Sequence, residues 1–260
     1  MSDGPVRVTH DGAVAVLTID RPEKLNALDA ETLAALETAV NEADRDPNVH
    51  VIVFTGTGRA FVAGGDIADL ESRRGLAHYL EFGETIHRVF RRIETCDTPT
   101  IAAVNGWALG GGAELMLAID IRLVAASAKV GVPEITLGLF PGAGGSQRLS
   151  RQVPQCHARE LMFTGEAISA EDAVAIGLAN RVVADDALMD EAMALAGKIA
   201  ARSPLVLKLL KRALIAGGDM PLTSALAHEQ AMISLVLDTD DAHEGCQAFL
   251  EKRKPDFKGS

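Results

Sequence analysis

Two patterns of apolar and polar positions, one typical of strands and one of helices, alternate along the first 185 residues. Short apolar runs that end near glycine or proline predict buried strands, and they occupy residues 13–19, 50–55, 100–104 and 119–125. Segments with apolar residues on one helical face lie between them and predict helices over residues 30–42, 76–94 and 113–118. Asp29 can cap the first of these helices. Strands that alternate with helices favour an α/β fold.

After about residue 185 the pattern becomes helical throughout. We expect helices over residues 186–201, 203–216, 221–237 and 240–252, where Ser203-Pro204 is a strong helix start. No strand is predicted here for these helices to cover, so they either pack back on the core or meet another subunit. We therefore divide the chain into an α/β core, residues 1–200, and a C-terminal helical oligomerisation region, residues 201–260.

Composition and charge exclude several classes of protein. The 260 residues are 48% hydrophobic and 23% charged, which is ordinary globular usage and excludes a disordered chain. Eight Phe, one Trp and one Tyr are too few for a protein that stacks single-stranded nucleic acid. The net charge of −11 also disfavours nucleic acid and anionic membrane surfaces as partners.

The three cysteines, Cys96, Cys156 and Cys246, are odd in number and widely spaced, which is typical of a reducing compartment. The first residues lack the pattern of a secretion signal, and no apolar run is long enough to span a bilayer. We therefore expect a cytoplasmic protein.

Glycine-rich segments follow three of the predicted strands. They are residues 59–66 (RAFVAGGD), 106–114 (GWALGGGAE) and, a little further on, 131–135 (GVPEI), and a fourth segment comes next at 140–149 (FPGAGGSQRL). Glycine lets a ligand approach the main chain, and the start of a helix presents unpaired N–H groups. Two N–H groups from two such junctions can hold a developing oxyanion. If the junctions adjoin, Glu114 and Glu134 flank one site.

Each of these features also has a purely structural interpretation. Glycine after a strand usually makes a tight turn, and Glu114 in a first helical turn is favoured by the helix dipole. Several other kinds of site are disfavoured because their motifs do not occur. The glycine spacing is not a dinucleotide fingerprint, no Walker or G-x-S-x-G motif occurs, and the seven scattered His make a metal site unlikely to form.

Five segments together resemble the crotonase, or enoyl-CoA hydratase/isomerase, family. In order and spacing they match over essentially the whole chain: IDRPEKLNALD (19–29), GRAFVAGGDI (58–67), AAVNGWALGGGAEL (102–115), VGVPEITLGLFPGAGGSQRL (130–149) and AFLEKRKPDF (248–257). The resemblance implies a spiral of repeated ββα units followed by a C-terminal helical region. It also implies an assembly of three or six copies, that is, a homotrimer or homohexamer.

The resemblance further implies an enzyme that adds water across the double bond of a 2-enoyl-CoA thioester to give 3-hydroxyacyl-CoA. By matching motifs, the N–H groups of Gly65 and Gly111 would form the oxyanion hole. Glu114 and Glu134 would act as acid and base, and Gly142 would help to position the water. No metal and no separate cofactor is implied, because CoA is part of the substrate.

Other matched positions imply contacts with CoA. Ala63, Asp66 and Ile67 lie in a segment that lines the CoA path, and Lys24 falls in a CoA-contacting region. On the C-terminal tail, two residues match positions that reach a neighbouring subunit's CoA: Phe249 and Lys252.

Two alternatives remain open on the same scaffold. One is a Δ3,Δ2-enoyl-CoA isomerase, which needs a single base, whereas two glutamates favour hydration. The other is a catalytically silent acyl-CoA-binding protein, which the intact glutamates and glycine junctions disfavour. The sequence departs from some hydratases at Ala68, where they have lysine, and residues 68–83 follow no family pattern, so the acyl chain length stays open.

Overall fold

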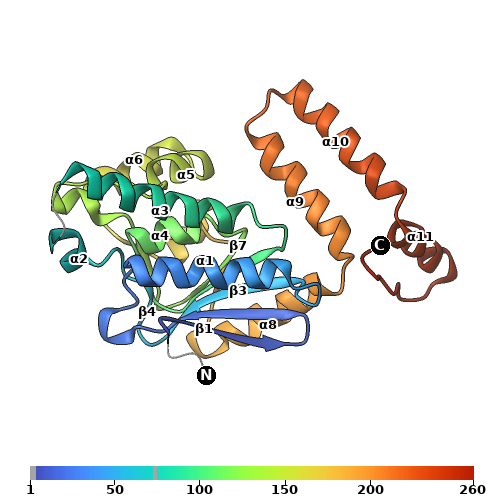
Figure 1. Ribbon diagram of the computed structural model, residues 1–260, viewed down its shortest axis with the longest axis horizontal. Helices are drawn as coiled ribbons and strands as arrows, with labels where there is room; N and C mark the ends of the chain where they lie inside the picture. The colour runs from blue at the N-terminus through green and yellow to red at the C-terminus, as the bar shows by residue number, and fades with distance from the viewer. Residues whose placement is uncertain (1–3, 73–74) are drawn as a thin grey trace.

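The computed structural model describes residues 4–72 and 75–260, and within them two β-sheets organise the core (Figure 1). The larger sheet has the order β1-β2-β3-β5-β7-β10 and the smaller one β4-β6-β8-β9. The larger sheet contains β1 (Val6–Asp11), β2 (Val14–Ile19), β3 (Val51–Gly56), β5 (Thr100–Val104), β7 (Ile121–Ala125) and β10 (Arg181–Val183). The smaller sheet contains β4 (Ala60–Val62), β6 (Trp107–Leu109), β8 (Lys129–Gly131) and β9 (Ile168–Ser169).

The two sheets arise from a repeated ββα unit. The strands β3, β5 and β7 lie parallel in the larger sheet, and each is followed directly by a strand of the smaller sheet, β4, β6 or β8. A helical segment then carries the chain to the next unit. The chain therefore winds as a spiral of ββα units with helices at its C-terminal end, which confirms the predicted fold class.

Helices cover the sheets and extend beyond them. Those of the core are α1 (Ala30–Arg45), α2 (Ile67–Ser72), α3 (Leu76–Glu94), α4 (Gly111–Leu117), α5 (Gly145–Gln152), α6 (Gln155–Thr164), α7 (Ala170–Ala175) and α8 (Leu188–Ala200). Those of the C-terminal part are α9 (Pro204–Gly218), α10 (Leu222–Leu237) and α11 (Asp240–Glu251). Three short 3₁₀ helices are η1 (Pro22–Lys24), η2 (Pro133–Leu137) and η3 (Asp185–Ala187).

Local sequence explains where α1 lies. The carboxylate of Asp29 accepts a hydrogen bond of 2.8 Å from the Thr32 N–H, which is the predicted N-cap. The helix buries Leu33, Leu36 and Val40, spaced to form one face. The helix packs against α3 and beside β1 and β2, so burial of apolar surface fixes it on the core.

The smaller sheet is the part of the core that the sequence pattern does not predict. Its strands have two or three residues each, too short for a period of two to be detected. The pattern also misses β1, whose residues after Val6 are exposed, and which pairs antiparallel with β2. An edge strand with mostly polar, exposed positions has no apolar signal to detect.

The helices α9, α10 and α11 form an arm that stands apart from the core in Figure 1. Basic side chains of α9 attach it to the core. Lys211, which is 7% exposed, lies 2.7 Å from the Asp120 carboxylate, and Arg212 makes a two-point contact with Asp97 at 2.6 and 2.9 Å. Within residues 4–72 and 75–260, no helix is long and apolar enough to cross a membrane.

Candidate active site

A cavity of about 320 Å³ opens where α3, α4, η2 and the turn at residues 141–145 meet. Seven residues predicted as site residues line it together: Ala63, Gly65, Ile67, Gly111, Glu114, Glu134 and Gly142. They come from segments up to 79 positions apart in the chain (Ala63 to Gly142), and the ββα winding brings them to one place.

Two glycine junctions meet at the wall of this cavity. A Cβ atom placed on Gly111 would lie 3.5 Å from the Gly65 nitrogen, so the two main chains adjoin. A Cβ atom on Gly112 would overlap the Val62 carbonyl oxygen, which explains why glycine stands where α4 packs on β4.

The main-chain N–H groups of Gly65 and Gly111 make no hydrogen bond within the bridge or the helix to which these residues belong. The bridge between Leu28 and Gly65 is made by the N–H groups of Leu28 and Asp66, which leaves that of Gly65 outside it. Gly111 is the first residue of α4, and a first helical residue has no acceptor within its own helix. Two adjacent donors at a helix start can stabilise negative charge on a ligand oxygen.

Glu114 is the most deeply buried carboxyl group of the site, with 3% of the residue exposed. Its Oε1 accepts hydrogen bonds of 2.8 Å from the N–H groups of Ala143 and Gly145. Burial, assisted by the nearby Glu134 carboxylate, raises the pKa of Glu114 to about 7, against the two hydrogen bonds, which lower it. A group with a pKa near 7 can give or take a proton at neutral pH.

Glu134 lies across the cavity on η2, and the 3₁₀ turn after Pro133 directs it inward. Its Oε2 is buried and has no hydrogen-bond partner among the described residues. Burial raises the pKa of Glu134 as well. The Glu134 charge also contributes to the raised pKa of Glu114, so burial and this charge both favour the protonated form of Glu114.

Four predicted contact residues do not line this cavity. Asp66 instead lies 3.7 Å from Arg21 and accepts a hydrogen bond from the Ala68 N–H at the start of α2. Lys24 is exposed on η1. Phe249, 83% exposed, and Lys252 belong to the arm, which lies at the opposite end of the molecule from α2 (Figure 1).

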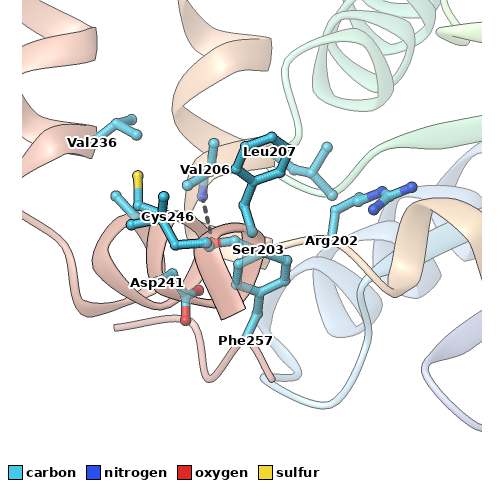
Figure 2. Close-up of a pocket in the computed structure, with 12 residues that line it drawn as sticks. Arg202, Ser203, Val206, Leu207, Val236, Asp241, Cys246 and Phe257 are labelled. Carbon is cyan, nitrogen blue, oxygen red and sulfur yellow. Dashed lines mark hydrogen bonds between the residues drawn. The ribbon is translucent and has the colours of Figure 1, made fainter. Parts of the chain in front are cut away.

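A second cavity of about 740 Å³ lies in the arm, among α9, α10, α11 and the C-terminal tail (Figure 2). Its lining is mainly apolar and includes Leu207, Cys246 and Phe257. Its acidic residue, Asp241, accepts hydrogen bonds from the N–H groups of Lys258 and Gly259 and so holds the tail in place. This cavity therefore lacks the paired acids and free donors of the first.

Sequence reasoning missed two groups of site residues. One is the pair of N–H donors from Ala143 and Gly145 that hold Glu114; the glycine-rich run at 142–145 was their signal. The other is the apolar lining, for which the sequence carries no separate signal because any helix face supplies such residues. It consists of Leu70, Phe82, Ile86, Leu137, Leu139 and Phe140.

Comparison with known proteins gives consistent results. Residues 9–260 match the family model described as enoyl-CoA hydratase/isomerase. The short-chain-enoyl-CoA hydratase of Clostridium acetobutylicum is 42% identical over 96% of this chain and 95% of its own, and the crotonyl-CoA hydratase of Syntrophomonas wolfei is 42% identical over 94% of each. The crystal structure of an enoyl-CoA hydratase from Bacillus anthracis superposes with a TM-score of 0.95 at 36% identity, covering 98% of this chain and all of that one.

Proposed function

The chain belongs to the enoyl-CoA hydratase/isomerase family, and we propose that it adds water to the double bond of a 2-enoyl-CoA, giving a 3-hydroxyacyl-CoA. One observation carries the proposal: two free N–H donors and two carboxyl groups of raised pKa face the same small, largely apolar cavity. The names of the two relatives, a short-chain-enoyl-CoA hydratase and a crotonyl-CoA hydratase, support it.

The N–H groups of Gly65 and Gly111 are proposed to bind the thioester oxygen. When water adds at C3, electrons move to that oxygen and make it an enolate. Donors fixed by the main chain stabilise this charge more than they stabilise the neutral carbonyl, so they accelerate the reaction rather than only tighten binding. Removing one such donor typically costs about 3 kcal/mol of transition-state stabilisation.

The two glutamates are proposed to move the protons. The water molecule loses one proton to an ionised carboxylate as its oxygen bonds to C3, and the α-carbon receives one from a protonated carboxyl group. Glu114 and Glu134 suit this pair of roles because burial raises the pKa of both, and that of Glu114, at about 7, lets it give or take a proton near neutral pH. With Oε1 of Glu114 engaged by two N–H donors, Oε2 is the oxygen available to the water.

We further propose that the arm completes the protein as an oligomer, a homotrimer or homohexamer. Exposed apolar residues on its helices include Leu214 and Leu222, at 67% and 74% exposure. A second copy would cover them, and the remote Phe249 and Lys252 would then reach the CoA of a neighbour rather than of their own subunit. CoA recognition by Ala63, Asp66, Ile67 and Lys24, and a cytoplasmic location, stay predictions.

Incubation of the purified protein with crotonyl-CoA tests the function. We expect the absorbance of the conjugated thioester to fall and 3-hydroxybutyryl-CoA to form. Turnover of a 3-enoyl-CoA to the 2-enoyl isomer without hydration would replace the proposal with the isomerase alternative. Saturable binding of crotonyl-CoA with no turnover would instead identify a silent acyl-CoA-binding protein.

A further inference from the structure

Behind the turn at residues 141–145 lies an ion pair that the proposed reaction does not use. Arg148, on α5, donates to both carboxylate oxygens of Glu94 at the end of α3, with distances of 3.1 and 2.8 Å. The side chains are 14% and 30% exposed. A two-point contact of this kind fixes the plane of the guanidinium group.

The fixed guanidinium group lies directly against the turn. A Cβ atom on Gly144 would overlap Nη1 of Arg148, so the guanidinium fills the space that a side chain at 144 would need. Gly144 also has a φ of +104°, which glycine adopts at low cost. Nη1 lies 3.4 Å from the Ala143 carbonyl oxygen, on the same peptide segment whose N–H groups hold Glu114.

The turn therefore has two sides. Toward the cavity, the N–H groups of Ala143 and Gly145 hold Oε1 of Glu114. Away from it, the guanidinium supports residues 143 and 144. We propose that Arg148, held by Glu94, is a positioning residue for Glu114, acting through this turn; the inference rests on the proposed function for its catalytic meaning.

The charges around Glu114 give the pair a second effect. The elements that pack on α4 include β4 and β6, which carry no titratable side chain, and α5, which carries Arg148 and the exposed Arg151. The positive charge of Arg148 opposes the burial that raises the pKa of Glu114. From η2, Glu134 acts in the opposite direction. Loss of the arginine should therefore raise that pKa further.

The test compares Arg148→Met with Arg151→Met. Arg151 lies on the same helix, is exposed and bonds to Gln147, so its replacement removes the same charge from α5 without touching the turn. For Arg148→Met we expect kcat for crotonyl-CoA to fall roughly 10- to 100-fold with little change in KM, because Glu114 loses its alignment. Arg148→Lys should recover part of this loss, and Arg151→Met should behave as the parent protein.

A second measurement, of thermal stability, does not depend on catalysis and so tests the role of Arg148 separately from the proposed function. The difference in Tm between each background and its Glu114→Gln derivative, followed against pH, reports the titration of Glu114. The midpoint of this titration should lie about half a pH unit or more higher in Arg148→Met than in the parent protein, and it should be unchanged in Arg151→Met. If the parent fails to hydrate crotonyl-CoA but the midpoint moves, the function is wrong, while the contact of Arg148 with the surroundings of Glu114 stands.

Glu94→Gln covers the case in which Arg148→Met does not fold. It should lower kcat for crotonyl-CoA, because the arginine is no longer held against the turn. Equal behaviour of Arg148→Met and Arg151→Met in both readouts overturns the proposal. So does a Glu94→Gln protein that keeps the parent kcat.

Discussion

Helix α4 in the core and helix α10 in the arm are both apolar, but they differ in how much of their surface is buried. All seven residues of α4 are buried, including a glutamate, whereas none of the sixteen residues of α10 is buried. Both segments are rich in Leu, Met and Ala. Apolar composition favours burial in both, but α4 is enclosed by β4, β6 and α5, whereas α10 packs mainly against α9 and leaves its other faces uncovered by the described residues.

The same contrast holds for polar groups. In the core, buried polar groups such as Glu114 are held by main-chain N–H donors of a distant segment. In the arm, the buried polar Lys211 serves to attach α9 to the core. The core thus encloses its cavity among residues of one chain, while the arm presents an apolar surface that no described segment of the chain covers.

The largest effect is expected from the two carboxyl groups of the core. Glu114→Gln and Glu134→Gln are nearly isosteric and should fold, yet each should lower kcat by about 10²–10⁴-fold if each carboxyl group moves a proton. Steady-state kinetics with crotonyl-CoA measures this. The double variant should lose far less than the product of the single losses, because both groups act on one transition state.

If Glu114→Gln keeps full activity, Glu114 is merely a carboxyl group at a helix start. The isomerase alternative predicts a different pattern: one of the two variants would keep much of its activity on a 3-enoyl-CoA.

The next effect concerns the arm. Leu214→Asp places a charge on the exposed apolar face of α9. If a second copy covers that face, an unpaired buried carboxylate costs several kcal/mol and the assembly should dissociate. Sedimentation velocity measures the mass, and Thr38→Asp, which adds the same charge to the exposed side of α1, is the matched control. A parent protein that sediments as a monomer at micromolar concentration would refute the proposed assembly.

A smaller effect is expected at the oxyanion donors. Gly111→Pro removes one N–H group, which should reduce kcat by about 10²-fold. Because proline is well accepted at the first position of a helix, the variant should keep α4. Gly111→Ala is the control: it retains the N–H, and its Cβ would lie 3.5 Å from the Gly65 nitrogen, an ordinary contact. Circular dichroism checks folding, and a folded proline variant with normal kcat would remove Gly111 from the oxyanion hole.

The smallest effect is a pH dependence of stability. The pKa of Glu114 is raised from 4.5 to about 7 in the folded state, so its contribution is present below about pH 4.5 and is lost as the pH rises through 7. The loss amounts to about 3 kcal/mol at most, at 1.36 kcal/mol per unit. Glu114→Gln should therefore gain several degrees in Tm over the parent protein between pH 5 and pH 8. A gap in Tm that is the same at both pH values would contradict the raised pKa.

Much of the fold was predictable because its longer elements carry their own signals. The strands β2, β3 and β5 and the helices α1, α3 and α10 lie within a few residues of their predicted bounds. The smaller sheet was not predictable, because strands of two or three residues are specified by their neighbours rather than by their own pattern. For the site, the motifs pointed to seven residues that do line one cavity. Their catalytic and binding roles stay predictions.

The amino-acid sequence by itself determined the longer helices, the longer buried strands and the positions of the glycine junctions, because each depends on residues close together in the chain. It did not indicate α2, α5, α6, α7 or β10. The tertiary structure decided what those residues could do. Glu114 has a raised pKa because distant segments remove it from water, and its orientation depends on N–H groups 29 and 31 positions away. The arm's apolar faces are exposed because no segment of the same chain covers them among the described residues. Burial and proximity are properties of packing, and local sequence does not contain them.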